Sequence, residues 1–327
     1  MSIIMRILRI IIVAFTAFIV LKISTFGWRF WARSFTAGKE ENVQLAERLK
    51  QHVYKLAQDI GDRSVFNYQG LQEAAGYISR QFESFGYQVE LQEYTVYNKT
   101  VKNIIVSKKG SVSPQEIIIA GAHYDTCSNP GADDNASAVA AVLELARFIS
   151  DKQTRRTIRF IAFVNEEPPF FKSEEMGSRV YARQAKRKGE EIKAALILES
   201  IGYYSQRLNS QRYPLFFGPF YPNRGNFIAV VGDFSSRRLV REVVANFKKK
   251  TRFPVESTVA FGFVPGIDFS DHWSFWQEGY RAAMITDTAF YRNPGYHSSR
   301  DTPDKLNYRY SSEVVEGLGA VIIELAG

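Results

Sequence analysis

Short apolar segments alternate along most of the chain with amphipathic segments in which apolar residues recur every three or four positions. The expected strands cover residues 88–96, 101–106, 116–120, 157–164, 192–198, 226–231 and 282–286. The expected helices cover residues 40–60, 69–85, 136–150, 174–188, 235–250 and 311–325. Buried strands that alternate with helices form sheets covered on both faces. The pattern therefore predicts an α/β fold around a largely parallel sheet.

The first 37 residues follow a different pattern. An apolar run extends from Ile10 to Leu21, with basic residues on both sides of it. The longer segment from Met5 to Phe26 can span a bilayer, which needs about 20 residues. We expect residues 1–37 to form an N-terminal hydrophobic helix that anchors the chain in a membrane as a single pass, with residues 38–327 outside the cytoplasm. A secretory signal that is cleaved, and a buried helix, remain as alternatives.

Composition and charge add limits to this picture. The chain has 327 residues, 45% of them hydrophobic, and no linker-like tract interrupts residues 38–327, which we expect to be one domain. The formal net charge is +8, but no nucleic-acid motif accompanies it, so we expect no nucleic-acid partner and interpret the basic clusters as solvated helix faces. The single cysteine, Cys127, excludes an intrachain disulfide and is interpreted as a small buried residue.

Side chains that can bind metals follow three successive apolar strands directly. They are His123 and Asp125, then Glu166 and Glu167, and then Glu199. Ligands of open α/β sheets bind beyond the carboxyl ends of the strands. We therefore expect these side chains to meet at one edge of the sheet.

Two further clusters lie in expected loops. Asp133 and Asp134 precede the helix expected from residue 136, where Asp and Asn are common helix caps, and we interpret Asp133 as the better metal ligand of the pair. His297 lies in the string YHSSRDTPDKL. Two histidines with several carboxylates suit zinc where thiolates are few. His272, in SDHWSF, is interpreted as supporting the pocket and not as a ligand.

The spacing of these residues suggests separate roles. His123 and Asp125 are two positions apart in an extended segment, so Asp125 can orient the other ring nitrogen of a metal-binding His123. Adjacent carboxylates at Glu166 and Glu167 fit a general base beside a ligand. One more carboxylate allows a bridge between two metal ions about 3.5–4 Å apart.

Five strings, GAHYDT, PGADDNAS, NEE, LES and GYHSSRDTPDKL, resemble in this order the co-catalytic zinc aminopeptidases. Relatives of that family include bacterial leucyl aminopeptidase, glutamate carboxypeptidase, transferrin receptor and glutaminyl cyclase. The resemblance implies a three-layer αβα sandwich with a mixed, largely parallel central sheet, and two zinc ions per chain. It further implies that Asp133 bridges both ions, with His123 and Glu199 on one ion and Glu167 and His297 on the other.

The resemblance also implies an activity. Glu166 would be the general base and Asp125 the carboxylate behind His123, in an aminopeptidase that hydrolyses N-terminal residues from peptides with a metal-activated water. Glu199 stands where many family members have Asp. The alternatives are a glutaminyl cyclase with one zinc, a metal-free receptor-like relative, and a carboxypeptidase or other amidase.

Overall fold

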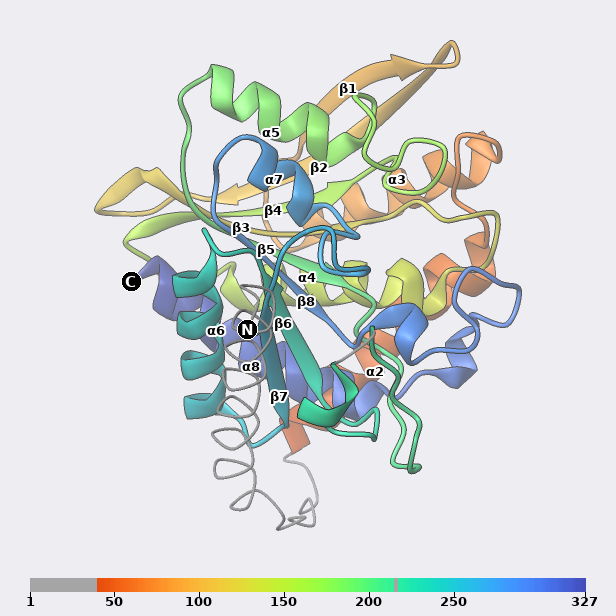
Figure 1. Cartoon of the computed structure of the whole chain (residues 1–327). Helices are drawn as coiled ribbons and strands as arrows, with labels where there is room; N and C mark the ends of the chain where they lie inside the picture. The colour runs from red at the N-terminus through yellow and green to blue at the C-terminus, as the bar shows by residue number, and fades with distance from the viewer. Residues whose placement is uncertain (1–39, 215–216) are drawn as a thin grey trace, which may run out of the picture. The chain divides into compact units, whose positions relative to one another are not determined.

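The computed structural model describes residues 40–214 and 217–327 (Figure 1). The expected N-terminal hydrophobic helix, within residues 1–37, lies outside the described residues. Among the helices of residues 40–214 and 217–327, none combines the length and the apolar character that crossing a membrane requires. Residues 40–327 form one compact unit.

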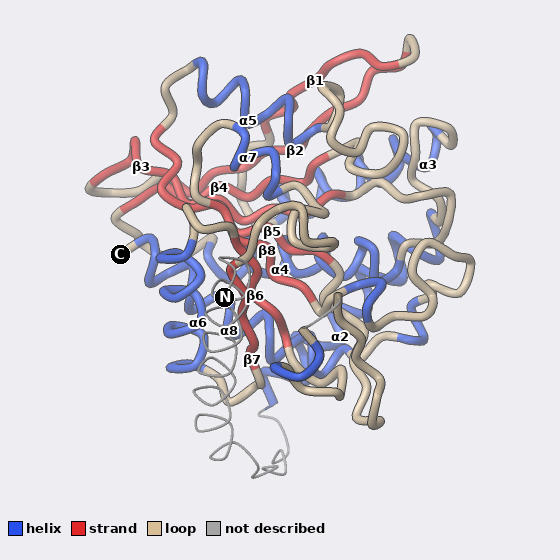
Figure 2. The backbone as a smooth tube through the Cα atoms, in the orientation of Figure 1, coloured by secondary structure: helices blue, strands red, loops and turns tan. Residues whose placement is uncertain are grey.

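An eight-stranded sheet runs through the centre of this unit in the order β1-β2-β4-β3-β5-β8-β6-β7 (Figure 2). Its strands are β1 (Glu90–Val96), β2 (Lys99–Lys108), β3 (Ser113–His123), β4 (Arg156–Phe163), β5 (Glu191–Glu199), β6 (Ile228–Gly232), β7 (Val255–Val259) and β8 (Ala282–Thr286). The four central strands β4, β3, β5 and β8 are parallel. β2 pairs antiparallel with β4, and β6 pairs antiparallel with β8. The expected mixed, largely parallel sheet is confirmed.

Helices cover both faces of the sheet (Figure 1). They are α2 (Glu40–Tyr54), α3 (Tyr68–Ser84), α4 (Ala138–Ile149), α5 (Gly177–Arg187), α6 (Arg237–Lys250), α7 (His272–Gln277) and α8 (Tyr308–Ala326). The core that includes residues of α2, α3, α4, α6 and α8 lies on one face. The core that includes residues of α5 and α7 lies on the other. The sheet is thus the middle of three layers.

Strand β3 shows why the central strands are apolar without alternation. Ile118 and Ala120 belong to the first core, whereas Ile117 and Ile119 belong to the second. Successive side chains of a strand point to opposite faces, so a strand covered on both sides buries every position. The continuous apolar runs of the sequence follow from this.

Two elements are not expected from the sequence. Strand β7 lies at the edge of the sheet and is partly exposed, so it lacks the apolar run of a central strand. Helix α7 has only six residues, too few for a periodic pattern to show. The helix expected over residues 40–60 also divides, because α2 ends at Tyr54 and a π-helical segment, η1 (Lys55–Ile60), follows.

The parallel strands set the position of the site. β3 ends at His123, β4 ends at Phe163 and β5 ends at Glu199. Because these strands are parallel neighbours, their carboxyl ends meet at one edge of the sheet, as expected.

Candidate metal centre

His123 is the last residue of β3, and its side chain is fully buried. Its Nδ1 lies 3.3 Å from the backbone oxygen of Asp125 and 3.6 Å from the Oδ1 of the same residue. Its Nε2 lies 3.3 Å from Asp134 Oδ1 and 3.2 Å from Glu199 Oε2. The imidazole is therefore oriented by Asp125 on one side and faces two carboxylates on the other.

The Asp134 carboxylate lies between the two histidines of the site. While its Oδ1 faces His123, its Oδ2 lies 3.0 Å from His297 Nε2. His297 Nε2 is also 3.1 Å from Glu167 Oε2. One carboxylate thus contacts two separate groups of metal-binding side chains through its two oxygens.

The structure corrects the expectation that Asp133 takes this bridging position. Asp133 Oδ1 accepts a hydrogen bond of 2.9 Å from the Gly202 amide, and Oδ2 accepts one of 3.0 Å from the Asn293 side chain. Its carboxylate is therefore already hydrogen-bonded to the protein, and it faces neither histidine within ion-pair distance. Asp134, for which the sequence favours a helix cap, occupies the position between the histidines.

Asp301 explains why the chain turns in this way. Its carboxylate accepts hydrogen bonds from the backbone amides of both Asp133 and Asp134, at 3.1–3.2 Å. These contacts fix the backbone of the loop and with it the directions of the two side chains. In the sequence, Asp301 stands out only as part of the motif that contains His297.

Glu166 and Glu167 follow β4 in a turn that Asp125 holds. The Glu166 amide donates to Asp125 Oδ1 and the Glu167 amide donates to Asp125 Oδ2, both at 3.1 Å. Asn165 precedes them with a positive φ of 59°, a conformation that Asn tolerates better than most residues. Asp125 therefore positions His123 and the two glutamates together.

Glu199 ends β5 and is oriented by side chains from two other segments. Its Oε2 accepts hydrogen bonds from Asn135 at 3.2 Å and from Ser270 at 2.8 Å. With these contacts the longer Glu side chain lies beside His123, as the pairing expected from the sequence requires.

The site residues fall into two clusters. Within each cluster, the ligand atoms all lie within 4.8 Å of one another. The first cluster is His123, Asp134 and Glu199. The second cluster is Cys127, Glu167 and His297, and Asp134 contacts it through His297.

Unpaired polar atoms in these clusters fit divalent metal ions. His123 Nε2, both carboxylate oxygens of Asp134 and Glu167 Oε1 are buried, and no hydrogen-bond partner for them occurs in residues 40–214 and 217–327. Buried polar atoms of proteins are nearly always paired. Nitrogen and oxygen atoms that converge in this way are the ligands that zinc takes when its sites are poor in thiolate.

Burial and mutual repulsion shift the acidity of the site carboxyls. Burial raises the pKa of Glu166 well above its ordinary value, and the Glu199 and Glu167 carboxylates add to this against the effect of His123. Burial and the Asp134 charge raise the pKa of Glu167 to about 8. Burial would also raise the pKa of Asp134, but the close imidazoles of His123 and His297 lower it below its ordinary value. Bound cations would favour the ionised carboxylates.

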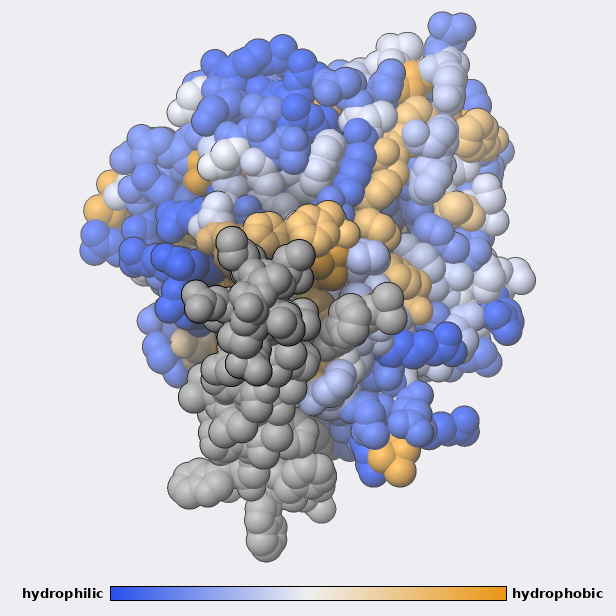
Figure 3. Space-filling view, in the orientation of Figure 1, coloured by the Kyte–Doolittle hydropathy of each residue, from blue (hydrophilic) through white to orange (hydrophobic). Residues whose placement is uncertain are grey.

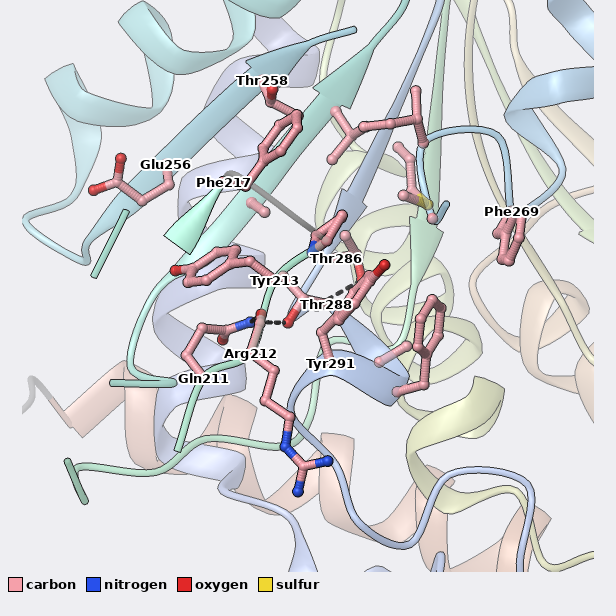
Figure 4. A pocket seen from close by; sticks show the side chains of 18 of the residues that line it. Gln211, Arg212, Tyr213, Phe217, Glu256, Thr258, Phe269, Thr286, Thr288 and Tyr291 are labelled. Carbon is pink, nitrogen blue, oxygen red and sulfur yellow. Dashed lines mark hydrogen bonds between the residues drawn. The ribbon is translucent and has the colours of Figure 1, made fainter. Parts of the chain in front are cut away.

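A largely apolar pocket opens beside Glu199 and encloses about 770 Å³, its open mouth included. Rings of Tyr213 and Phe217 lie on one side and Phe269 on the other, while the Arg212 guanidinium points away (Figure 4). Gln211 donates a hydrogen bond of 2.7 Å to Thr288 at its base. In Figure 3 hydrophobic residues form a band across the middle of the visible face. The pocket can accept a large apolar group next to the first cluster.

A smaller hollow lies beside Glu167 and encloses about 330 Å³, its open mouth included, and Asp125, Cys127 and Phe170 also line it. Cys127 is half-buried there, whereas the sequence predicts a buried side chain. The site thus borders two hollows, one lined by Glu199 and the other by Glu167.

Two histidines and one arginine are buried but lie outside the two clusters. His272 Nε2 lies 2.8 Å from the Ile267 backbone oxygen and belongs to neither cluster. His52 contacts Tyr77 and Glu144, away from both clusters. Arg63 is fully buried and holds the loop that follows β3, a role for which the sequence carries no local signal.

The comparison with known families agrees with this geometry. The profile described as Peptidase family M28 matches residues 103–322, well over half of the chain. The chain belongs to peptidase family M28. The resemblance to the co-catalytic zinc aminopeptidases is confirmed by this match.

Two relatives show how far the likeness extends for this M28 member. The uncharacterized protein YfbL of Escherichia coli (strain K12) is 43% identical over 282 residues, which are 83% of this chain and 86% of that protein. The probable aminopeptidase YDR415C of Saccharomyces cerevisiae is 27% identical over 236 residues, which are 68% of this chain and 57% of that protein.

Solved structures share the fold. A zinc aminopeptidase from Bacillus subtilis, BSAP, has a TM-score of 0.70 at 15% identity and covers 86% of this chain and 95% of its own. A Bacteroides thetaiotaomicron glutaminyl cyclase bound to N-acetylhistamine has a TM-score of 0.65 at 20% identity, and the match covers 85% of this chain and 97% of the cyclase. The fold is therefore common to peptidases and cyclases, and the choice between them depends on the site.

Proposed function

We propose that this M28 family member is a zinc-dependent aminopeptidase that holds two zinc ions and uses Glu166 as its general base. The observation that supports this most directly is the position of Asp134, whose two carboxylate oxygens face different histidines at 3.3 and 3.0 Å. A carboxylate placed in this way can bridge two cations, as two-metal hydrolases require.

His123, Glu199 and Asp134 would hold one zinc ion, and Glu167, His297 and Asp134 the other. Zinc, when bound, supplies Lewis-acid chemistry: it polarises the scissile carbonyl and lowers the pKa of a water molecule toward neutrality. The contribution of the protein is to fix the donor atoms, which Asp125, Asn135 and Ser270 do through the hydrogen bonds described above.

Glu166 is the side chain placed to move the proton. Its Oε2 lies 3.7 Å from His123 Nε2, so its carboxylate faces the first cluster without belonging to it. In the proposed reaction this carboxylate takes a proton from the attacking water and gives it to the nitrogen of the leaving amine. Burial raises the pKa of Glu166 in the metal-free protein, and bound cations would shift it back toward the ionised form that a base needs.

The charge around the site favours a substrate with a free amino terminus. Among the described residues, no Lys or Arg forms an ion pair with Asp134, Glu166, Glu167 or Glu199, whose ion-pair partners are histidines. Two bound zinc ions would offset much of this negative charge, but no Lys or Arg is paired here that could hold a peptide carboxylate, whereas a carboxylate of the site can hold an ammonium group. This supports aminopeptidase over carboxypeptidase activity.

The apolar pocket beside Glu199 suits the side chain of the first residue. Its walls include Phe217, Phe227 and Met284, so an apolar side chain such as that of leucine or phenylalanine would be buried against apolar groups there. The hollow beside Glu167 would take the rest of the peptide.

The test is hydrolysis of aminoacyl-arylamides and short peptides by the purified protein. We expect cleavage from the amino terminus that a chelator removes and added zinc restores. Glu166→Gln should lower kcat by about 10²–10⁴-fold, the usual contribution of a general base, with unchanged zinc content.

The controls separate the proposed peptidase from its alternatives. N-acetylated versions of the same peptides should resist cleavage, because they lack the ammonium group. Pyroglutamate formed from N-terminal Gln without any peptide cleavage, at one zinc per chain, would replace the peptidase with a cyclase. A zinc-loaded protein that turned over neither kind of substrate would refute an enzymatic role.

We further propose that residues 1–37 anchor the protein in a membrane, with residues 38–327 outside the cytoplasm. The support is the apolar run from Ile10 to Leu21 and its basic flanks. The full chain should stay in the membrane fraction after an alkaline wash, and a chain that begins at Gly38 should not. Release of the full chain by that wash would exclude an anchor.

A further inference from the structure

Cys127 is a metal-binding side chain at the site for which the proposed reaction has no use. Its Sγ, Glu167 and His297 form the second cluster, in which each residue offers one ligand atom within 4.8 Å of the others. The chain contains one cysteine. Its thiol is half-buried at the hollow beside Glu167, so it faces the site and not a packed core.

A second observation indicates that the space between these residues binds a ligand. Glu167 is only 3% exposed, and its Oε1 is buried and has no hydrogen-bond partner among the described residues. The other oxygen, Oε2, lies 3.1 Å from His297 Nε2. A buried carboxylate oxygen without a donor is costly unless a cation binds it.

The backbone that carries Cys127 is fixed on its N-terminal side. The amide of the preceding residue, Thr126, donates to the Arg63 oxygen at 3.1 Å, and the Thr126 hydroxyl accepts from the Arg63 amide at 2.9 Å. The same hydroxyl donates to Asp62 at 3.0 Å. The thiol is therefore presented to the second cluster by a segment held at three points.

We propose that Cys127 is the fourth protein ligand of the zinc ion that Asp134, Glu167 and His297 hold. On binding, the sulfur forms a bond to zinc and the thiol proton leaves to solvent. This inference rests on the metal centre proposed above and adds one donor to it. Four protein donors of this kind suit the tetrahedral preference of zinc, and the soft thiolate favours zinc over magnesium or calcium.

The extra ligand makes the two metal positions unequal. The position at Cys127 would have four protein donors, as closed zinc sites do, whereas the position at His123 and Glu199 would have three with Asp134, the number typical of catalytic zinc sites. An ion beside Cys127 would therefore be the more tightly bound one, and His123 and Glu199 would hold the ion with a position left for a substrate oxygen.

The test is cobalt substitution of the whole protein, followed by absorption spectroscopy. Because Cys127 is the only thiol in the chain, a thiolate-to-cobalt charge-transfer band in the near ultraviolet can arise from no other residue. We expect that band with the first equivalent of cobalt. The band should be absent from Cys127→Ser. This variant should also bind zinc at the second cluster at least about tenfold more weakly, because even the loss of a group that only supports a ligand usually weakens metal binding by that much.

The two histidines provide a matched pair of variants. His297→Ala should lose the band because it removes a ligand of the same ion, and His123→Ala should keep it because it removes a ligand of the other ion. A measurement on the unaltered protein guards against a misfolded variant: iodoacetamide should alkylate Cys127 in the metal-free protein and not in the zinc-loaded one.

The outcomes distinguish this inference from the proposed activity. A protein that binds two metal ions and cleaves peptides, but shows no thiolate band and no protection of Cys127, overturns the inference and leaves the peptidase intact. A protein with the band and no turnover supports the ligand and overturns the activity. A protein that binds no metal overturns both.

Discussion

At the scale of single residues, neighbours of the same chemical type have different surroundings in this site. Asp133 and Asp134 are adjacent aspartates, both almost fully buried. The carboxylate of Asp133 is hydrogen-bonded by an amide and a side-chain amide, whereas that of Asp134 faces two imidazoles. Their chemistry is decided by what surrounds each carboxylate.

We predict that Asp134→Asn loses zinc and that Asp133→Asn retains it. The side-chain amide introduced by Asp134→Asn would offer one neutral oxygen in place of a carboxylate that faces both clusters, so both metal positions weaken. Asp133→Asn disturbs hydrogen bonds to Gly202 and Asn293 and should lower stability by about 1–3 kcal/mol. Zinc content by mass spectrometry and denaturant unfolding of both variants measure the two effects. Equal zinc loss in the two variants would contradict the assignment.

At the scale of elements, the loops at the end of the sheet are held by buried polar groups on the surrounding helices and turns. The Arg63 guanidinium, between η1 and α3, donates hydrogen bonds of 2.8–3.0 Å to five backbone oxygens. Those oxygens belong to Leu56, Gly61, Tyr124, Pro130 and Gly131. Arg63 thus connects the start of the domain to the loop between His123 and Asp134.

We predict that Arg63→Met lowers the free energy of unfolding by at least about 3 kcal/mol, because several buried carbonyls lose their donor. The free energy of unfolding of Arg63→Lys should lie between those of Arg63→Met and the unaltered protein. An ammonium group still has three donors, but it lacks the planar fork of a guanidinium. Guanidinium-induced unfolding and zinc content measure the effect on the fold and on the site. An Arg63→Met protein as stable as the unaltered one would show that the loop holds its shape without the arginine.

Helices α2 and α4 meet around a second buried charge. Glu144 of α4 accepts hydrogen bonds from Arg48 at 2.8 Å and Arg147 at 3.0 Å, and lies 3.4 Å from His52 Nε2. Burial alone would raise the pKa of Glu144, but these three cationic or polar partners lower it from 4.5 to about 2. The ionised carboxylate is therefore favoured in the folded state.

We predict that Glu144→Gln destabilises the fold by about 1–3 kcal/mol at pH 7. Because the folded pKa lies below the unfolded one, the stabilisation by Glu144 is complete above about 4.5 and is lost as the pH falls toward about 2. The difference between the variant and the unaltered protein should therefore narrow from pH 7 to pH 3.5 in denaturant unfolding. A constant gap between Glu144→Gln and the unaltered protein over this pH range would refute the linkage.

At the scale of the whole molecule, the fold gathers carboxylates from distant segments at one edge of its sheet. Asp125, Asp134, Glu166, Glu167 and Glu199 are all buried there. Burial and mutual repulsion raise the pKa of both glutamates after β4, so keeping these two carboxyls ionised in the metal-free protein opposes the folding of the chain. Metal ions that bind the folded state and not the unfolded chain reverse this effect.

We predict that zinc raises the Tm of the protein and that a chelator lowers it. Free zinc at 100 times the dissociation constant stabilises a one-site protein by about 2.7 kcal/mol, and two sites add further. Differential scanning calorimetry at fixed pH measures the change, with Asp134→Asn as the control that should respond least. A Tm that is independent of zinc in the unaltered protein would contradict a metal site in the folded state.

Much of the fold could be predicted from the sequence because its signals are local. The buried strands at residues 157–164 and 192–198 are apolar runs, and β4 and β5 lie within one residue of those limits. Strand β8 coincides with the expected residues 282–286. By contrast, the strand order and the edge strand β7 depend on pairings between segments far apart, and no local pattern encodes them.

By itself, the sequence determined most of the segments that form strands and helices, and which metal-binding side chains follow the strands. The period of the apolar residues, and the burial that an apolar run predicts, depend on neighbouring positions. They can therefore be read along the chain. The tertiary structure alone decided that Asp134 and not Asp133 faces the histidines, and that Cys127 lies beside Glu167. Asp301 sets the direction of the two aspartates through hydrogen bonds to backbone amides 167 and 168 positions away, and contacts over such separations exist only after the chain has folded.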